Sequence, residues 1–215
     1  MKKEIMTDNG IYSYEEVELY EGRKFLDPEI GKKNLLDFKK VMEKHGIVFG
    51  LWFGTLLGAV REKNFIEYDE DIDIFVLNEY RQNVLNALFD LEKTGLKVAR
   101  YNEKKGLLSI IRDNEYIDIY FYRKVLNTRR MGINTLEAKY LEHMDTLDFL
   151  GDVFPVPANV EEVLTVLYGE DWRVPKRDGK PVNKTFERKL KIFIKENLPF
   201  IATFYREYLK PIFKR

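Results

Sequence analysis

The sequence predicts an α/β domain of mixed (α+β) type, in which a mixed β-sheet is flanked by helices. Two observations lead to this fold class. Segments with helical spacing of apolar residues alternate with short apolar runs rich in branched and aromatic residues, as far as residue 123. Of the 215 residues, 45% are hydrophobic, which is enough for a sizeable core. We expect one folded domain over residues 1–183 and a basic helical segment over residues 184–215.

The expected elements follow from spacing and from residue type. Thr55 is the expected N-cap of the second helix. Residues 125–134 are predicted as a loop, with an extended edge as the alternative, and short strands are expected to end at Pro155 and Pro157. Helices are expected where apolar residues recur at helical intervals, over 29–45, 55–63, 79–95 and 160–169. Strands are expected over the branched and aromatic runs 47–53, 71–77, 96–101, 106–112 and 115–123.

The composition excludes several classes of protein. Lysine and arginine together number 36, as do aspartate and glutamate, so the zero net charge favours neither a nucleic-acid binder nor an acidic tail. The absence of cysteine excludes disulfides, thiolate nucleophiles and cysteine-ligated zinc. The first 20 residues lack the apolar stretch of a signal peptide, and no apolar run approaches the ~18 residues of a spanning helix. We therefore expect a cytoplasmic protein, soluble or peripheral.

The segment 184–215 carries nine basic and three acidic residues, mixed with many apolar ones. Two interpretations stand beside each other. A basic amphipathic helix can lie on an anionic membrane surface, here the inner face of the membrane. The same pattern is also typical of a helix that packs on the domain and turns its basic face to solvent.

Five acidic residues lie within the seven positions 67–73, at the start of the predicted strand 71–77. Alternate side chains share a face of a strand, so Asp69, Asp71 and Asp73 point the same way. Neighbouring carboxylates repel one another in a low dielectric, so one is protonated or a cation lies between them. Magnesium takes oxygen ligands, often one or two carboxylates, and keeps positions for phosphates. The cluster therefore predicts a divalent-metal site.

Two further features strengthen this hypothesis. Gly54 and Thr55 stand at a predicted strand-to-helix turn, where a glycine allows close approach and the N–H groups of a helix start can bind phosphate. Asp118 lies in the middle of an apolar and aromatic strand, where a charge needs a partner. If that strand lies beside the strand of Asp71 and Asp73, three carboxylates meet at one point, as phosphoryl-transfer sites require.

These residues resemble the signature of a known superfamily. A Gly-Thr pair, a short helix, a strand with Asp-x-Asp and a later third Asp are similar to the polymerase-β-type nucleotidyltransferases. The string WFGTLLGAVREKNFIEYDEDIDIFV, residues 52–76, closely resembles the signature of the LicD family, whose members are similar to fukutin and fukutin-related protein. The string LYGEDWRVP, residues 167–175, resembles that family's closing element. The resemblance spans roughly residues 29–178.

The resemblance implies a nucleotidyltransferase-like fold and a metal-dependent phosphotransferase. The implied reaction moves phosphocholine or a polyol phosphate from a CDP-activated donor to a hydroxyl of a glycan or lipid-linked saccharide, with Mg²⁺ or Mn²⁺ and without nucleic acid. By position, the resemblance implies that the catalytic metal ligands are Asp71, Asp73 and Asp118, and that Asp118 is alternatively the base. It implies that Gly54 and Thr55 form the turn that binds the donor phosphates. Arg61 would neutralise charge on the diphosphate, and Asp69 would lie beside the metal or face it.

Other functions remain open at the level of sequence. A nucleotidyltransferase that attacks the α-phosphorus of an NTP would carry the same motifs and release pyrophosphate. A nucleotide-sugar glycosyltransferase also uses Asp-x-Asp, but it leaves Gly54-Thr55 and Asp118 unexplained. A non-catalytic binding module could keep the fold, although all three expected carboxylates are present.

Single residues have plainer explanations as well. The acids at 67–73 could form a solvated turn, and Asp118 could be a buried residue satisfied by backbone donors or by an arginine such as Arg112 or Arg123. Arg61 could form a surface ion pair. Arg129 and Arg130 could bind phosphate or lie in solvent.

Overall fold

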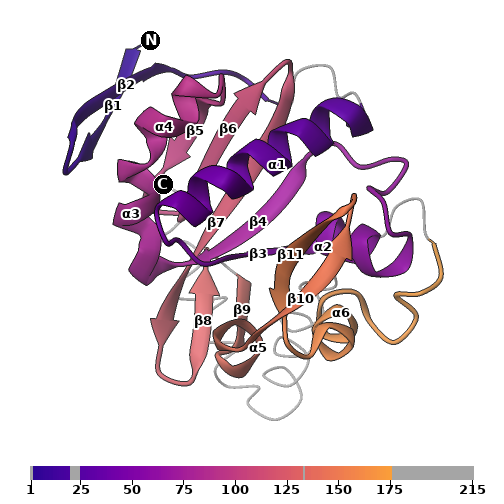
Figure 1. The fold of residues 1–215 in the computed structure, drawn as a ribbon. Helices are drawn as coiled ribbons and strands as arrows, with labels where there is room; N and C mark the ends of the chain where they lie inside the picture. Colours follow the sequence, from indigo (N-terminus) through magenta and orange to yellow (C-terminus); the bar gives the residue numbers. More distant parts are fainter. Residues whose placement is uncertain (1, 20–24, 133, 176–215) are drawn as a thin grey trace, which may run out of the picture. The chain divides into compact units, whose positions relative to one another are not determined.

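The computed structural model describes residues 2–19, 25–132 and 134–175, which Figure 1 shows as a ribbon. The chain divides into two compact units, Met1–Val163 and Leu164–Arg215. The predicted basic segment 184–215 and the predicted boundary at residue 183 lie outside the described residues. Within the described residues, no helix has the length and apolar character needed to cross a membrane.

A mixed sheet lies at the centre of the first unit, as the sequence predicts. Its strands follow the order β3-β4-β7-β6-β5, and β8 pairs with the end of β7 and with β9. Strands β4 and β7 run parallel, whereas the other neighbours are antiparallel. The strands are β3 (Phe49–Leu51), β4 (Ile72–Leu77), β5 (Lys97–Asn102), β6 (Leu107–Arg112), β7 (Glu115–Val125), β8 (Thr128–Met131) and β9 (Asn134–Glu137).

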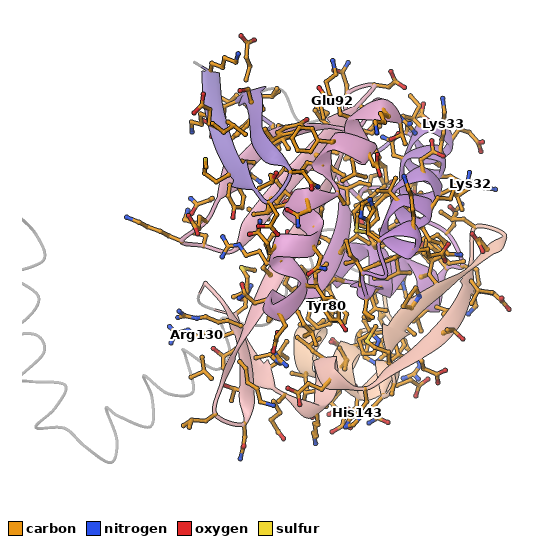
Figure 2. All side chains as sticks on the ribbon, turned by 60° about the vertical axis from the view of Figure 1, so that its left-hand side comes forward. Lys32, Lys33, Tyr80, Glu92, Arg130 and His143 are labelled. Atoms are coloured by element: carbon orange, nitrogen blue, oxygen red, sulfur yellow. The ribbon has the colours of Figure 1, made fainter. Side chains whose placement is uncertain are left out.

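Helix α1 (Pro28–Lys44) lies across the sheet in Figure 1 and packs on β7. It begins at the N-cap Asp27, whose carboxylate accepts hydrogen bonds from two backbone N–H groups of the first turn. It ends before Gly46, which adopts a φ of +62°. Figure 2 shows Lys32 and Lys33 on the side of α1 that faces away from the sheet. The remaining helices are α2 (Phe53–Arg61), the 3₁₀ turn η1 (Asn78–Tyr80), α3 (Arg81–Asn86), α4 (Leu88–Lys93), α5 (Lys139–Glu142) and α6 (Val160–Tyr168).

Three predicted elements differ from the structure. The single helix predicted over 79–95 is divided into η1, α3 and α4, because the backbone N–H of Ala87 bonds to the carbonyls of both Asn83 and Val84 and tightens the turn. The predicted N-cap role of Thr55 is wrong, since α2 begins at Phe53 with Trp52 as its N-cap. Of the two possibilities for residues 125–134, the structure has the extended one, with β8 and the start of β9 in place of a loop alone.

Two hairpins lie beside the two edges of the main path of the sheet. The first, β1 (Lys2–Thr7) with β2 (Gly10–Glu15), contacts β5 and has no counterpart in the predicted elements. The second, β10 (Met144–Phe149) with β11 (Asp152–Pro157), contacts β3 and agrees with the short strands predicted before Pro157. Because an uncovered edge invites pairing with other chains, these hairpins protect the sheet.

Gly58 of α2 allows the helix to approach the segment that leads to the acidic cluster. A Cβ atom at Gly58 would lie 2.5 Å from the backbone oxygen of Asn64. Backbone cannot move aside as a side chain can, so we expect Gly58→Ala to lower the free energy of unfolding by about 1–3 kcal/mol in urea denaturation.

Gly31 of α1 provides the matched control, because it is also a helical glycine. A Cβ there would meet only the Leu26 side chain, at 3.1 Å. We expect Gly31→Ala to change the free energy of unfolding by less than about 1 kcal/mol, since the better helix propensity of alanine offsets the small shift of Leu26. Equal effects of the two substitutions would contradict this account of Gly58.

Candidate active site

The structure brings Asp73 and Asp118 together at the centre of the sheet. The two residues are register partners on the parallel strands β4 and β7, so their side chains share one face. Asp73 is 6% exposed and Asp118 is 1% exposed. Asp71 precedes β4 by one residue and is partly exposed. The strands of Asp73 and Asp118 are therefore neighbours, as the sequence hypothesis required, and Asp71 lies just before β4.

Gly54 and Thr55 hold Asp73 from the start of α2. The backbone N–H of Gly54 donates to Oδ2 of Asp73 over 3.0 Å. The backbone N–H of Asp73 donates in turn to Oγ1 of Thr55 over 2.9 Å. Thr55 is fully buried, so its hydroxyl positions β4 rather than facing solvent. The Gly-Thr pair therefore holds Asp73 at two points, Gly54 at its carboxylate and Thr55 at its backbone N–H.

Asp69 lies against the same turn. A Cβ at Gly54 would come within 2.5 Å of Oδ2 of Asp69, so only glycine admits this carboxylate. The Oδ2 atom of Asp69 is buried and has no hydrogen-bond partner among the described residues. A buried carboxylate oxygen without a partner is unfavourable unless a ligand reaches it.

The backbone is strained where β3 passes into α2. Phe53 adopts a φ of +36°, which a bulky residue rarely does. Its ring packs edge-on against Tyr120 at 5.1 Å between centroids, and it lies 5.4 Å from the ring of Trp52. These contacts hold the strained residue, which sets the direction of the N–H of Gly54.

Burial dominates the electrostatics of the cluster. It raises the pKa of Asp69 to about 7, and the charges of Glu70 and Glu62 add to the effect. It raises the pKa of Asp71 and of Asp73 well above the ordinary value, and repulsion between the carboxylates of the cluster adds to both. Such a cluster is unfavourable in its ionised form without a cation.

Asp118 has partners that the sequence did not predict. Oγ of Ser109 donates a short hydrogen bond to Oδ1 of Asp118, and the guanidinium of Arg100 lies 3.4 Å from both carboxylate oxygens. Arg112, suggested as a partner of Asp118, instead contacts Asn34 and Asp37. A polar residue within the apolar run LLSIIR was the available signal for Ser109. Burial still raises the pKa of Asp118, although Ser109 and Arg100 oppose the effect.

The other basic residues considered for phosphate binding have acidic or backbone partners. The guanidinium of Arg61 pairs with Glu62, its neighbour in sequence. Arg129 is buried and pairs with Glu79 and Glu142. Arg130 is exposed and donates to the carbonyl of Gly132. Arg61 alone of these three lies next to the acidic cluster in sequence, and its role toward a diphosphate stays a prediction.

The donor set suits a hard divalent cation. The side chains of the candidate site, which all offer carboxylate oxygens, are Asp69, Asp71, Asp73 and Asp118. The buried Oδ2 of Asp69 lacks a hydrogen-bond partner in the described part of the chain. Within residues 2–19, 25–132 and 134–175, no group of three or more histidine or acidic side chains is arranged so that it could hold a metal ion. A Mg²⁺ ion often binds only one or two carboxylates and takes its other ligands from water and phosphate.

Comparison with known proteins identifies a family. Residues 46–159 match the family model described as LicD/FKTN/FKRP, nucleotidyltransferase domain. The match covers more than half of the chain and includes both strands of the acidic cluster. It also agrees with the resemblance found in residues 52–76.

Curated relatives are similar over part of their length. The ribitol-5-phosphate transferase FKTN of Macaca fascicularis is 27% identical over 148 residues, which cover 63% of this chain and 32% of the relative. The lipopolysaccharide cholinephosphotransferase LicD of Haemophilus influenzae is 39% identical over 57 residues, which cover 26% of this chain and 22% of the relative. The chain thus spans about a third or less of these relatives.

A solved structure is similar in fold. The solution structure of the antibiotic-resistance factor ANT(2″)-Ia has a TM-score of 0.50 and covers 86% of this chain and 96% of its own. The sequence identity is 12%, so the likeness concerns the fold alone. It agrees with the predicted mixed α/β class.

The raised pKa of Asp69 predicts a pH dependence of stability in the metal-free protein. The folded-state pKa of about 7 lies above the ordinary 3.8. Protonation of Asp69 therefore favours the folded state. Its contribution to the free energy of unfolding is complete below about pH 3.8 and is lost as the pH rises through 7. In EDTA, we expect the melting temperature of Asp69→Asn to fall less between pH 5 and pH 8 than that of the wild type, by several degrees.

Asp148→Asn is the matched control, because Asp148 is an exposed aspartate on β10. Its melting temperature should follow that of the wild type across the same pH range. Parallel curves for the wild type and Asp69→Asn would show that the Asp69 carboxyl is not desolvated as described.

Proposed function

We propose, since the chain belongs to the LicD/FKTN/FKRP nucleotidyltransferase domain family, that it transfers phosphocholine or a polyol phosphate from a CDP-activated donor to a hydroxyl group of a glycan. The observation that carries this proposal is the register of Asp73 and Asp118 on adjacent parallel strands, with the Gly54 N–H on Asp73. The names of two relatives, a ribitol-5-phosphate transferase and a cholinephosphotransferase, support the same class of reaction.

Asp71 and Asp73 are the proposed holders of a Mg²⁺ or Mn²⁺ ion, with Asp69 beside them. When bound, such an ion neutralises charge that develops on the donor phosphates. The unpartnered oxygen of Asp69 and the mutual repulsion of the carboxylates support a cation at this place. Asp118 is either a further ligand or the acceptor of the hydroxyl proton.

The proposed transfer is a direct in-line displacement. The acceptor oxygen forms a bond to the β-phosphorus of the donor while the bond from that phosphorus to the bridging oxygen breaks, and CMP leaves with the electron pair. The proton of the acceptor hydroxyl passes to a carboxylate of the cluster or to water. A covalent enzyme intermediate is not required: the chain has no cysteine, and His45 is engaged with Asp90 at 2.9 Å.

The remaining partners follow from the reaction. The acceptor is a glycan or a lipid-linked saccharide, and nucleic acid has no part in the reaction. The proposed location is the cytoplasm, with contact to the inner membrane face if the basic segment 184–215 binds lipid. A lysine- and arginine-rich segment gains about 1 kcal/mol per basic residue near an anionic surface.

A donor screen tests the proposal. We expect CDP-choline, CDP-ribitol or CDP-glycerol, each with magnesium, to raise the melting temperature of the wild type. At 100 times the dissociation constant the gain in stability is about 2.7 kcal/mol, which is several degrees for a domain of this size. The double variant Asp71→Asn/Asp73→Asn should lose this shift, because an amide binds a hard cation far more weakly than a carboxylate.

Asp145→Asn/Asp148→Asn is the control, since both are exposed aspartates on strand β10 and the double substitution removes the same two charges. It should keep the wild-type shift. The released product then separates the two reactions of this fold: CMP supports the proposal, whereas pyrophosphate released from CTP indicates a nucleotidyltransferase. A shift that is equal in the wild type and in Asp71→Asn/Asp73→Asn would overturn the proposed metal site.

A further inference from the structure

A row of four side chains crosses the sheet at the acidic cluster. Register pairs link neighbours in the row across adjacent strands, and the side chains of the row share one face. The row consists of Arg100 on β5, Ser109 on β6, Asp118 on β7 and Asp73 on β4. The positive charge of Arg100 therefore lies at one end of the row, and Asp73, at the other end, belongs to the candidate active site.

Hydrogen bonds and close contacts link Arg100, Ser109 and Asp118 in this row. The guanidinium of Arg100 donates to Oγ of Ser109 over 3.3 Å from Nε and 3.1 Å from Nη2. Nη2 also lies 3.4 Å from each carboxylate oxygen of Asp118, and Ser109 donates to Oδ1 of that carboxylate. Asp118 thus has a positive partner, whereas Asp73 accepts from an uncharged donor, the backbone N–H of Gly54.

A β-bulge aims Arg100 at this row. The register between β5 and β6 pairs Val98 with Ile110 and then Arg100 with Ser109, so Ala99 is an extra residue. Without the extra residue, Ala99 would stand opposite Ser109 and Arg100 would lie one position further along. Bulges often redirect a side chain beside an active site.

The N-terminal hairpin supports the bulge. The backbone N–H of Val17, two residues after β2, donates to the carbonyl of Ala99 over 2.9 Å. Strand β2 also packs against β5, and its side chains Tyr12 and Tyr14 are buried. The hairpin therefore contacts the strand that carries the bulge and bonds to the extra residue itself.

We infer that Arg100 is a positioning residue of the active site, which holds and neutralises Asp118 so that, of the two roles proposed above, Asp118 is not a further ligand and the divalent cation is left to Asp71 and Asp73. This inference rests on the proposed function, because it assigns a role toward the metal of that reaction. A positive charge within reach of the cation also keeps the cation from being bound too tightly. Arg100 therefore sets how strongly the site binds metal.

Manganese binding measures this role without a substrate. The free Mn²⁺ signal in electron paramagnetic resonance gives the dissociation constant of Mn²⁺ for each purified variant. We expect Arg100→Gln to bind Mn²⁺ about tenfold more tightly than the wild type, because a repelling charge is removed and Asp118 is released to ligate. Arg100→Lys keeps the charge and should stay within about twofold of the wild type.

Two controls separate the role from a general effect. Arg123→Gln removes the same charge from an exposed arginine on the other face of β7 and should leave Mn²⁺ affinity within about twofold. In the Asp118→Asn background, Arg100→Gln should gain less than about threefold, because Arg100 acts through Asp118. An equal gain in both backgrounds would overturn the positioning role.

A purely structural arginine would leave Mn²⁺ affinity unchanged or weakened in Arg100→Gln, and either result would refute the inference. If Arg100→Gln fails to fold, as judged by thermal denaturation, Arg100→Met removes the charge and keeps the apolar stem, with the same expected gain. Failure of the proposed function has a different signature: wild type and Asp71→Asn/Asp73→Asn would then bind Mn²⁺ equally, or not at all.

Discussion

Ionised carboxylates on neighbouring strands repel one another, and the repulsion grows where burial lowers the local dielectric. Asp73 and Asp118 stand side by side on β4 and β7 in this situation, with Asp71 and Asp69 close by. The fold keeps them there because the strand pairing fixes the register and the start of α2 holds Asp73 from two sides. The protein therefore maintains an unfavourable charge cluster that a cation and a phosphate-bearing ligand can make favourable.

The carboxylates of the cluster have different neighbours, and these neighbours affect them differently. Phe53 accepts backbone strain at φ +36°, and this turn directs the Gly54 N–H at Asp73. Arg100 neutralises Asp118 from the far side of the row, through a bulge that the N-terminal hairpin supports. One carboxylate is thus balanced by the protein itself, and Asp71 and Asp73 are the proposed metal ligands. Neutralising one carboxylate lowers the negative charge of the site, which suits a substrate that carries negative charge itself.

Much of the fold could be predicted from the sequence, because the spacing of apolar residues indicates which side chains are buried. The helix at 29–45 and the strands β3, β4, β5, β6 and β7 follow from spacing and residue type. The strands β8 and β9 do not, because the sequence of their segment is typical of a loop. The N-terminal hairpin was missed because its strands are polar and exposed on one face, without a long apolar run. Arg100 was missed for a different reason: its direction depends on a bulge, and the position of a bulge is set by tertiary contacts. The placement of Thr55 failed because its hydroxyl bonds to Asp73 and does not cap the helix.

We propose that Asp71 and Asp73 hold a divalent cation beside Asp118, and anomalous diffraction from crystals grown with manganese tests this. We expect a manganese peak within about 2–2.5 Å of carboxylate oxygens of both Asp71 and Asp73, with the guanidinium of Arg100 still on Asp118. A peak bound elsewhere, or a cluster that stays without a peak when manganese and a CDP-linked donor are both present, would contradict it.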